Sequence, residues 1–236
     1  MLIKGFQKLS MIDYPGKASS VIFLFGCNFL CNFCHNPELL DALKAKELKT
    51  YEEKEILDYL EANVGFLDGV SVTGGEPTIN PELPEFLKKI YNLGLLIKVD
   101  TNGSNPEMLQ ELLDKKIVDF LAMDIKAWFD DYSKVLKNSD KISIENIKKS
   151  INIVKKFPNY EFRITIAPGI NKEDIIKISE YLKSVGANKK LAIQEFRPDK
   201  VYDKDLEKFP KTSENILNEF SEIAKPFFEQ VIVRKE

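Results

Sequence analysis

The sequence is poor in the residues that hold small secreted proteins together. Its 236 residues include only three cysteines and a single histidine. Because the cysteines are odd in number and all lie between Cys27 and Cys34, a disulfide framework is not expected. Cysteines that remain as thiols are good metal ligands, so this part of the chain is a candidate metal site.

The chain also lacks a long apolar run and a block of basic residues. No run approaches the length of a membrane-spanning segment, and charge and glycine interrupt the N-terminus too early for a signal peptide. The formal net charge is only -3, and Lys and Arg are spread along the sequence. We therefore expect a cytoplasmic protein whose partners are neither nucleic acids nor membranes.

Composition and length indicate one globular domain. Hydrophobic residues make up 44% of the chain and charged residues 30%, a balance typical of a folded protein. A chain of 236 residues fits one large domain better than two small ones. Within this single domain, 1-236, we expect an N-terminal extension at 1-17, a partial barrel at 18-200, and a C-terminal helix and strand at 201-236.

Apolar runs rich in Val, Ile and Phe alternate with segments of helical periodicity. The apolar runs predict buried strands at Ser19–Phe25, Gly69–Val72, Leu95–Val99, Val118–Met123, Glu161–Ala167 and Leu191–Phe196. The helical segments are Tyr51–Asn63, Pro81–Leu93, Pro106–Lys115, Ile144–Phe157, Lys172–Val185 and Ser213–Ala224. This alternation predicts an α/β fold with a parallel sheet, either doubly wound or barrel-like. About six βα units favour a partial (β/α)6 TIM-type barrel.

The strongest functional signal is the loop after the first predicted strand, where Cys27, Cys31 and Cys34 follow the spacing C-x3-C-x2-C. Functional residues in such folds follow the C-terminal ends of strands. A structural zinc ion needs four ligands, and the only candidate for the fourth is His35, which is directly adjacent to Cys34 and would be strained. Redox-active thiols are another alternative. A 4Fe-4S cluster is favoured, because three cysteines leave one iron open to a substrate or cofactor.

This cysteine spacing resembles that of the radical S-adenosylmethionine superfamily. The stretch from Ser10-Met11-Ile12-Asp13-Tyr14-Pro15-Gly16 to Cys34-His35-Asn36-Pro37 looks like the glycyl-radical-enzyme activating group, particularly the activating proteins of anaerobic ribonucleoside-triphosphate reductase. The resemblance implies one 4Fe-4S cluster, bound by the three cysteines, and S-adenosylmethionine as the second cofactor.

Paired glycines follow the second predicted strand, in Thr73-Gly74-Gly75-Glu76-Pro77. Glycines at this place let the backbone approach a ligand, although such pairs usually just form turns. The segment resembles the family's GGEP motif. The resemblance implies that Gly74, Gly75 and Glu76 contact the methionine amino group of the cofactor.

Polar residues also follow the third and fourth predicted strands. Asp100 opens the sequence Asp100-Thr101-Asn102-Gly103, where an Asx-turn or helix cap is the simpler interpretation. Asp124 and Lys126 alternate around Ile125, and they could be only an ion pair. Both segments resemble the DTNG and D-x-K motifs of the pyruvate formate-lyase activating group. That likeness implies that Asp100, Asn102, Asp124 and Lys126 line the cofactor pocket. In that group the two aspartate positions also hold a monovalent cation.

Arg163 lies in the fifth predicted strand. An inward guanidinium could bind the methionine carboxylate, whereas an outward one would meet only solvent, and we favour the inward orientation. The pyruvate formate-lyase activating group also has a histidine late in the chain, which this sequence lacks. Gln194, Arg197 and Asp199 are candidates for its place.

The resemblance implies a defined activity. The protein would cleave S-adenosylmethionine reductively to a 5'-deoxyadenosyl radical and generate a glycyl radical on a partner enzyme. Electrons would come from a reductant of the flavodoxin or ferredoxin type, and no catalytic side chain beyond the cluster and cofactor would be needed. Two alternatives stay open. One is a radical enzyme acting on a small molecule, of the 7-carboxy-7-deazaguanine synthase type. The other is a non-catalytic zinc or iron-sulfur binding module.

Overall fold

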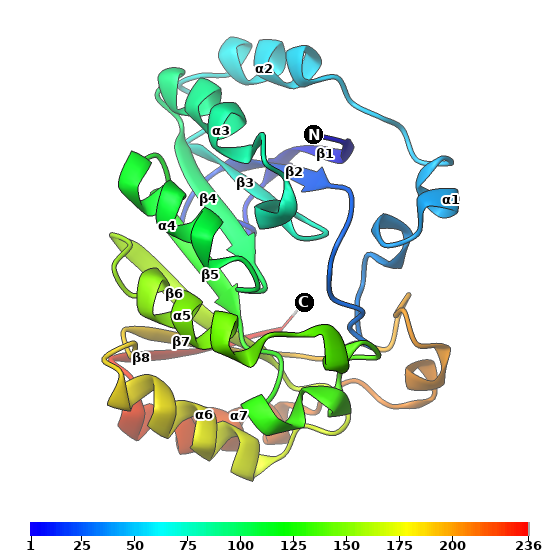
Figure 1. Ribbon diagram of the computed structural model, residues 1–236, viewed down its shortest axis with the longest axis vertical. Coiled ribbons are helices and arrows are strands. Elements are labelled where there is room, and N and C mark those ends of the chain that lie inside the picture. Colours follow the sequence, from blue (N-terminus) through cyan, green and yellow to red (C-terminus); the bar gives the residue numbers. More distant parts are fainter. Residues whose placement is uncertain (236) are drawn as a thin grey trace.

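The computed structural model describes residues 1-235 and contains one eight-stranded sheet whose strand order follows the sequence. The first pair of strands is antiparallel, and every later pair is parallel. The strands are β1 (Ile3–Ser10), β2 (Ser19–Leu24), β3 (Gly69–Gly74), β4 (Leu96–Thr101), β5 (Phe120–Asp124), β6 (Asn159–Thr165), β7 (Lys190–Gln194) and β8 (Gln230–Arg234). Within the described residues β1 and β8 do not pair, so the sheet curves without closing (Figure 1).

A helix follows each strand from β2 to β7. These helices are α2 (Glu53–Ala62), α3 (Leu83–Asn92), α4 (Pro106–Lys115), α5 (Ile144–Val154), α6 (Lys172–Ser184) and α7 (Glu214–Ala224). Figure 1 shows them along the outer side of the curved sheet. The structure thus has the predicted strands and helices, with small shifts at their ends, and it confirms a single α/β domain with the form of a partial (β/α)6 barrel.

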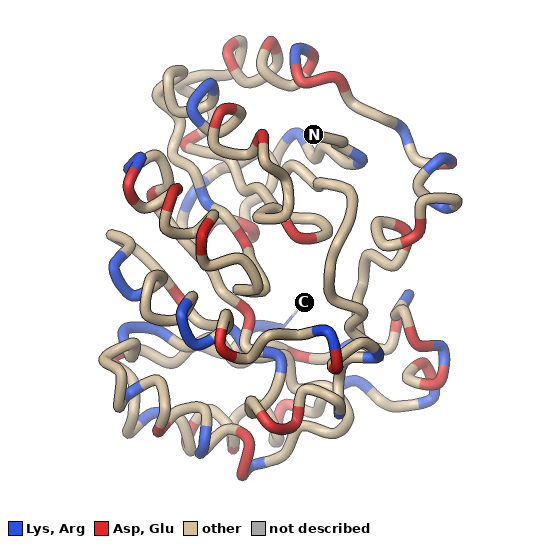
Figure 2. The backbone as a smooth tube through the Cα atoms, viewed as in Figure 1, with Lys and Arg blue, Asp and Glu red and all other residues tan. Residues whose placement is uncertain are grey.

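The remaining helices are short and lie mostly in the connections that leave the C-terminal ends of the parallel strands. They are η1 (Pro37–Leu39), α1 (Ala42–Ala45), η2 (Pro77–Ile79), η3 (Phe129–Lys134), η4 (Ser139–Lys141), η5 (Lys204–Lys208) and η6 (Lys225–Phe227). None of the helices described in residues 1-235 is long and apolar enough to cross a membrane. Figure 2 shows Lys and Arg interspersed with Asp and Glu over the helices, in keeping with the low net charge.

The two faces of the sheet differ in chemistry. Successive side chains of a strand point to opposite faces. The face toward the helices is apolar and fully buried, as Val99, Phe162 and Ile193 illustrate at 0% exposure. The inner face is polar, and residues in register on neighbouring strands place their side chains there together. Its polar members include Ser71, Lys98, Asp100, Asp124, Glu161, Arg163 and Gln194.

The N-terminal segment was not expected to enter the sheet. β1 nevertheless pairs with β2 along its length, with register shifts on either side of the central pairs. The following loop closes the N-terminal end of the barrel, where Tyr14 is 5% exposed and its ring packs edge-on against Phe120, with ring centroids 6.0 Å apart. Lys4, Gly5 and Lys8 break the apolar pattern of this strand, which explains why it is hard to recognise in the sequence.

Candidate active site

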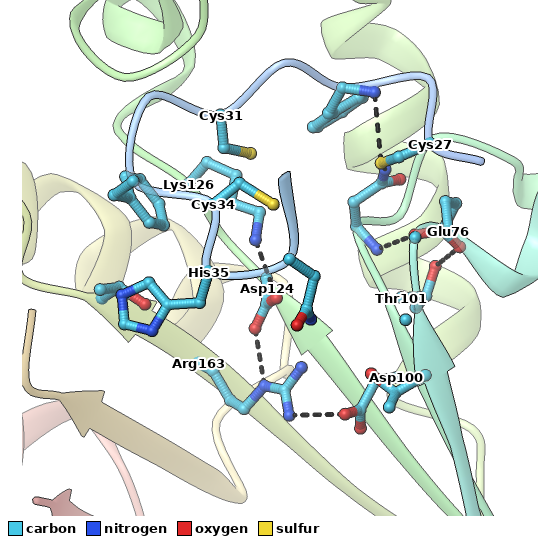
Figure 3. A pocket seen from close by; sticks show the side chains of 18 of the residues that line it. Cys27, Cys31, Cys34, His35, Glu76, Asp100, Thr101, Asp124, Lys126 and Arg163 are labelled. Atoms are coloured by element: carbon cyan, nitrogen blue, oxygen red, sulfur yellow. Dashed lines mark hydrogen bonds and ion pairs between the residues drawn. The ribbon is translucent and has the colours of Figure 1, made fainter. Parts of the chain in front are cut away.

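The residues that the family resemblance assigns to the cluster and the cofactor all line one cavity at the C-terminal ends of the strands. The structure brings the side chains together from loops far apart in the chain (Figure 3). The predicted residues on this wall are Cys27, Cys31, Cys34, Gly74, Gly75, Glu76, Asp100, Asn102, Asp124, Lys126 and Arg163. Their roles stay predictions, but their convergence is a property of the fold.

The cysteine loop is held by two irregular segments on either side of it. From one side, Asn32 N–H donates to the carbonyl of Val135 at 2.9 Å. From the other, Tyr202 N–H donates to the carbonyl of Cys34 at 3.0 Å, and Asp203 N–H donates to that of Asn32 at 2.9 Å. Because backbone bonds fix the loop on both flanks, its cysteine positions do not depend on a bound metal alone.

The three sulfurs face a common space. In Figure 3 the Sγ atoms of Cys31 and Cys34 point toward the space that Cys27 faces from the opposite side. Burial raises the pKa of Cys27 and of Cys31 to about 12, and it also raises that of Cys34. Without a metal these groups are therefore neutral thiols, and metal binding must release their protons.

The donor set fits an iron-sulfur cluster better than a single zinc ion. Within residues 1-235 no three Cys, His, Asp or Glu side chains are grouped tightly enough to hold one metal ion. In a 4Fe-4S cluster the thiolates bind different irons, so they need not converge on one point. His35, the zinc ligand considered above, instead forms a hydrogen bond of 3.0 Å between its Nε2 and the carbonyl oxygen of Arg197.

The paired glycines press the second loop against the start of the cysteine loop. Gly75 N–H donates to the carbonyl of Leu24, and Glu76 N–H donates to that of Gly26, each at 2.8 Å. A Cβ on Gly75 would lie 1.8 Å from the carbonyl oxygen of Gly26. Gly74 has a φ of +113°, and a Cβ there would lie 2.4 Å from the nitrogen of Leu24. Only glycine allows these two loops to come so close.

Glu76 is buried, at 1% exposure, and it ties this loop to the loop after β4. Its Oε1 accepts from Thr78 N–H at 3.1 Å, from Thr78 Oγ1 at 2.5 Å and from Thr101 Oγ1 at 2.8 Å. Its Oε2 accepts from Asn102 N–H at 2.6 Å. Burial raises the pKa of Glu76 although these hydrogen bonds oppose the increase. The Glu76 carboxylate therefore holds the loops after β3 and β4 together.

Alternating charges cross the inner face of β4, β5 and β6. The Arg163 guanidinium lies between two carboxylates, with Nη1 3.2 Å from Asp100 Oδ2 and Nε 2.6 Å from Asp124 Oδ1 (Figure 3). Lys126 Nζ is 2.8 Å from Asp124 Oδ2, and Lys98 pairs with Asp100 at the other end. The inward orientation of Arg163 is thus the one that the structure has, and the ion pair of Asp124 with Lys126 coexists with a position on the cavity wall.

These ion pairs and the burial of their members shift the pKa values of the charged side chains. Burial favours the neutral form of Asp124, but the charges of Arg163 and Lys126 outweigh it and hold its pKa well below the usual range. The pKa of Asp100 is likewise lowered, since Arg163 and Lys98 overcome the effect of burial. For Lys98 burial dominates, and its pKa is lowered despite the neighbouring carboxylate. Both aspartates therefore stay ionised at neutral pH.

This arrangement does not suit the monovalent cation that the family resemblance allows. A cation between Asp100 and Asp124 would need two carboxylates in want of positive charge. Here the Arg163 guanidinium occupies that position, and Lys98 and Lys126 supply a second cation to each aspartate. No role in the site is therefore assigned to a bound sodium or potassium ion.

Some cavity residues escaped the sequence-based prediction. Thr101 and Thr165 line the wall, and Thr165 could have been found because it has the same strand parity as Arg163. Of the three candidates for the place of the late histidine, Gln194 is in register with Thr165 on the next strand and lines the cavity, whereas Arg197 and Asp199 do not line it. The structure therefore favours Gln194.

Comparison with known proteins gives a consistent picture. The family model described as the radical SAM superfamily matches residues 21-182. A Methanocaldococcus jannaschii protein named as a glycyl-radical enzyme activating enzyme is 38% identical over 239 residues, which cover 99% of this chain and 95% of that protein. The pyruvate formate-lyase-activating enzyme of Clostridium pasteurianum is 30% identical over 247 residues, covering 89% of this chain and 96% of that enzyme.

Solved structures share the fold at low identity. Streptococcus suis SuiB bound to S-adenosylmethionine has a TM-score of 0.68 at 15% identity; the match covers 91% of this chain and 50% of SuiB. Archaeal TYW1 has a TM-score of 0.55 at 16% identity, with 89% of this chain and 72% of TYW1 covered. The chain thus spans about half the length of SuiB, and these likenesses concern the fold alone.

Proposed function

Because the chain belongs to the radical SAM superfamily, we propose that it activates a glycyl-radical enzyme, most specifically an anaerobic ribonucleoside-triphosphate reductase. The observation that carries the proposal is the convergence of three cysteines and an alternating charge network on one cavity at the C-terminal ends of the strands. Similarity over nearly the full length to a protein named as such an activating enzyme supports the class of activity. Family membership also sets aside the non-catalytic binding module.

The chain's cofactors are a 4Fe-4S cluster and S-adenosylmethionine. When bound, the cluster supplies the electron that splits S-adenosylmethionine into methionine and a 5'-deoxyadenosyl radical. In our proposal Cys27, Cys31 and Cys34 hold the cluster. Backbone hydrogen bonds hold these cysteines in place relative to the charged wall of the cavity, which is formed by Asp100, Asp124, Lys126 and Arg163. No acid, base or nucleophile of the chain takes part in bond breaking, which fits a site whose titratable groups are paired with one another.

The charged wall suits the zwitterionic methionine end of the cofactor. In our proposal Lys126 and Arg163 attract its carboxylate, while Asp100 and Asp124 balance their charge and attract its ammonium. The amide carbonyls near Gly74 offer further acceptors for the ammonium, since glycine leaves that backbone uncovered. Glu76 acts by ordering this backbone, and direct contact with the ammonium stays a prediction.

The adenosine end needs neutral polar partners. In our proposal Thr165 and Gln194, which lie in register on β6 and β7, serve the ribose hydroxyl groups. A side-chain amide can donate and accept at once, as the two hydroxyls of a ribose require.

The identity of the partner rests on the resemblance of the stretch from Ser10 to Pro37, which begins with the segment Ser10–Gly16. This segment lies at the N-terminal end of the barrel, where Ser71 Oγ donates to the carbonyl of Asp13 at 3.2 Å. It therefore closes the floor of the barrel opposite the cavity. The resemblance is therefore one of sequence and does not identify a surface that contacts the reductase, so the partner must be tested directly.

The test is anaerobic co-incubation with candidate glycyl-radical enzymes. The reconstituted protein, S-adenosylmethionine, and either dithionite or a flavodoxin-type or ferredoxin-type reductant are mixed with each candidate. We expect release of 5'-deoxyadenosine and a glycyl-radical doublet by electron paramagnetic resonance (EPR) on the anaerobic ribonucleoside-triphosphate reductase. Cys31→Ala is the control, and it should abolish both signals. A doublet on another glycyl-radical enzyme would reassign the partner, and 5'-deoxyadenosine without any doublet would favour a small-molecule substrate.

A further inference from the structure

One side-chain amide connects the loop after β4 to a cluster cysteine. Asn102 is 5% exposed, and its Nδ2 lies 3.8 Å from Cys27 Sγ and 3.0 Å from Asn28 Oδ1. The backbone N–H of Phe29 is a second donor to the same sulfur, at 3.4 Å. Cys27 therefore receives a donor from a distant loop in addition to one from its own loop.

The orientation of this amide is fixed by its neighbours. Asn102 Oδ1 accepts from Ser104 N–H at 2.9 Å, so the Nδ2 group must face the cysteine loop. Asn28 is fixed in turn, because its Nδ2 donates to Ser104 Oγ at 2.8 Å while its Oδ1 accepts from Asn102. The three side chains and one backbone group form a closed cycle that leaves an Asn102 hydrogen directed at Cys27.

The backbone of Asn102 is held as firmly as its side chain. Its N–H donates to the buried Glu76 carboxylate at 2.6 Å, which places the residue at the junction of three cofactor loops. A donor fixed in this way does not need to reorganise when the charge on its acceptor changes. Such a donor stabilises whichever state of the acceptor carries more negative charge.

We propose that Asn102 is a positioning residue that raises the reduction potential of the cluster through its hydrogen bond to the Cys27 sulfur. Reduction adds one electron to the cluster, and part of the added negative charge lies on the ligand sulfurs. The amide hydrogen bond is stronger to the more negative sulfur, so it favours the reduced state. Reduction is the step that must precede cleavage of S-adenosylmethionine. This inference rests on Cys27 being a cluster ligand, which iron content tests separately.

The first measurement is a redox titration of the reconstituted protein, followed by EPR of the reduced cluster in the absence of S-adenosylmethionine. Asn102→Leu removes the donor while retaining the approximate size of the side chain. At a fixed solution potential we expect the ratio of reduced to oxidised cluster to fall about tenfold. For a one-electron couple this corresponds to a decrease of 59 mV in the midpoint potential.

Ser104→Ala is the matched control. It deprives Asn28 Nδ2 of its acceptor and so loosens the same connection between loops, but it leaves the Ser104 N–H and the Asn102 donor in place. We expect its midpoint potential to equal that of the wild type. An equal shift in both variants would show that the loop contact, and not the donor, sets the potential. An unchanged potential in Asn102→Leu would also overturn the proposal.

A second measurement does not depend on any variant. Wild-type protein containing asparagine labelled with ¹⁵N only at the side-chain amide is reconstituted and reduced. We expect pulsed EPR to detect hyperfine coupling between the cluster and a labelled amide nitrogen. Absence of this coupling, with about four irons bound per chain, would overturn the hydrogen bond without affecting the proposed activity. Failure to bind iron would instead count against the cluster assignment.

Discussion

Replacement of Arg163 by methionine tests the charge network most directly. The guanidinium is 12% exposed and serves two carboxylates that are 17% and 25% exposed, Asp100 and Asp124. Removing one partner of a buried ion pair costs about 3–5 kcal/mol, because a charge is left uncompensated. A domain of this size loses about 2–4 °C of melting temperature per kcal/mol. We therefore expect the melting temperature of Arg163→Met to fall by ~6–20 °C.

The decrease in melting temperature caused by Arg163→Met should become smaller as the pH falls. In the wild type Arg163 lowers the pKa of Asp100 and Asp124, so their contribution to stability is complete above the unfolded pKa of about 3.9 and disappears only in more acidic solution. Without Arg163 the effect of burial is opposed less, and the folded pKa values rise. The carboxylates can then take up protons, so the difference in melting temperature between variant and wild type should narrow as the pH falls from 7 toward ~4.

The assay is thermal unfolding of the reconstituted protein under anaerobic conditions, followed by circular dichroism at one scan rate. Adding Asp124→Asn to Arg163→Met removes one uncompensated charge and should recover part of the lost stability. Lys54→Met is the control, because Lys54 pairs with Asp58 at 83% and 60% exposure, and such pairs contribute only about 0–1 kcal/mol. The reasoning would be refuted if the melting-temperature difference between Arg163→Met and the wild type did not change with pH and the double variant recovered no stability.

Two further predictions concern the cysteine loop. Gly75→Ala places a Cβ against the carbonyl of Gly26, so the loop after β3 must move away from the cysteine loop. We expect the reconstituted variant to bind less than about half of the wild-type iron, while its far-ultraviolet circular dichroism stays unchanged. Full iron loading would contradict the steric argument. Asn138→Ala removes a bond to the Asn28 carbonyl and one from Leu30 N–H, both 2.9 Å. Each bond contributes about 1 kcal/mol, so the loss of the cluster in air should become roughly 30-fold faster. Equal rates of bleaching in Asn138→Ala and the wild type would show that the flanking backbone hydrogen bonds alone hold the cysteine loop.

The sequence predicts the barrel well because its signals are local. Each βα unit has an apolar run followed by helical periodicity, and the loop motifs occur where a parallel sheet must bring them together. β1 was missed because its charged and glycine residues hide its pairing with β2. The flanks of the cysteine loop were missed for a different reason. Asn32 and Val135 are bonded through their backbones, and no side-chain pattern records such a pairing.

The chemistry of single residues was less predictable than their positions. The family resemblance placed Glu76 and Asn102 in the cofactor pocket, and both residues line the cavity. It could not reveal that four hydrogen bonds already occupy the Glu76 carboxylate, or that Asn102 turns its amide toward a sulfur. These facts depend on how three loops pack against one another. A motif therefore identifies where a residue lies more reliably than what its side chain contacts.

The last strand shows how far the requirements of the site extend into the fold. Below the charge network, Glu161 is 0% exposed, and Arg234 of β8 meets it with two bonds of 2.6 and 2.8 Å. Lys190 Nζ also lies 3.5 Å from Glu161 Oε2. The charge of Glu161 in turn acts on the neighbouring Lys98 and Arg163. A barrel that ended at β7 would take the bidentate Arg234 partner from this carboxylate, and removing one partner of a buried ion pair costs about 3–5 kcal/mol. β8 therefore contributes to the buried charges that lie next to the cavity wall.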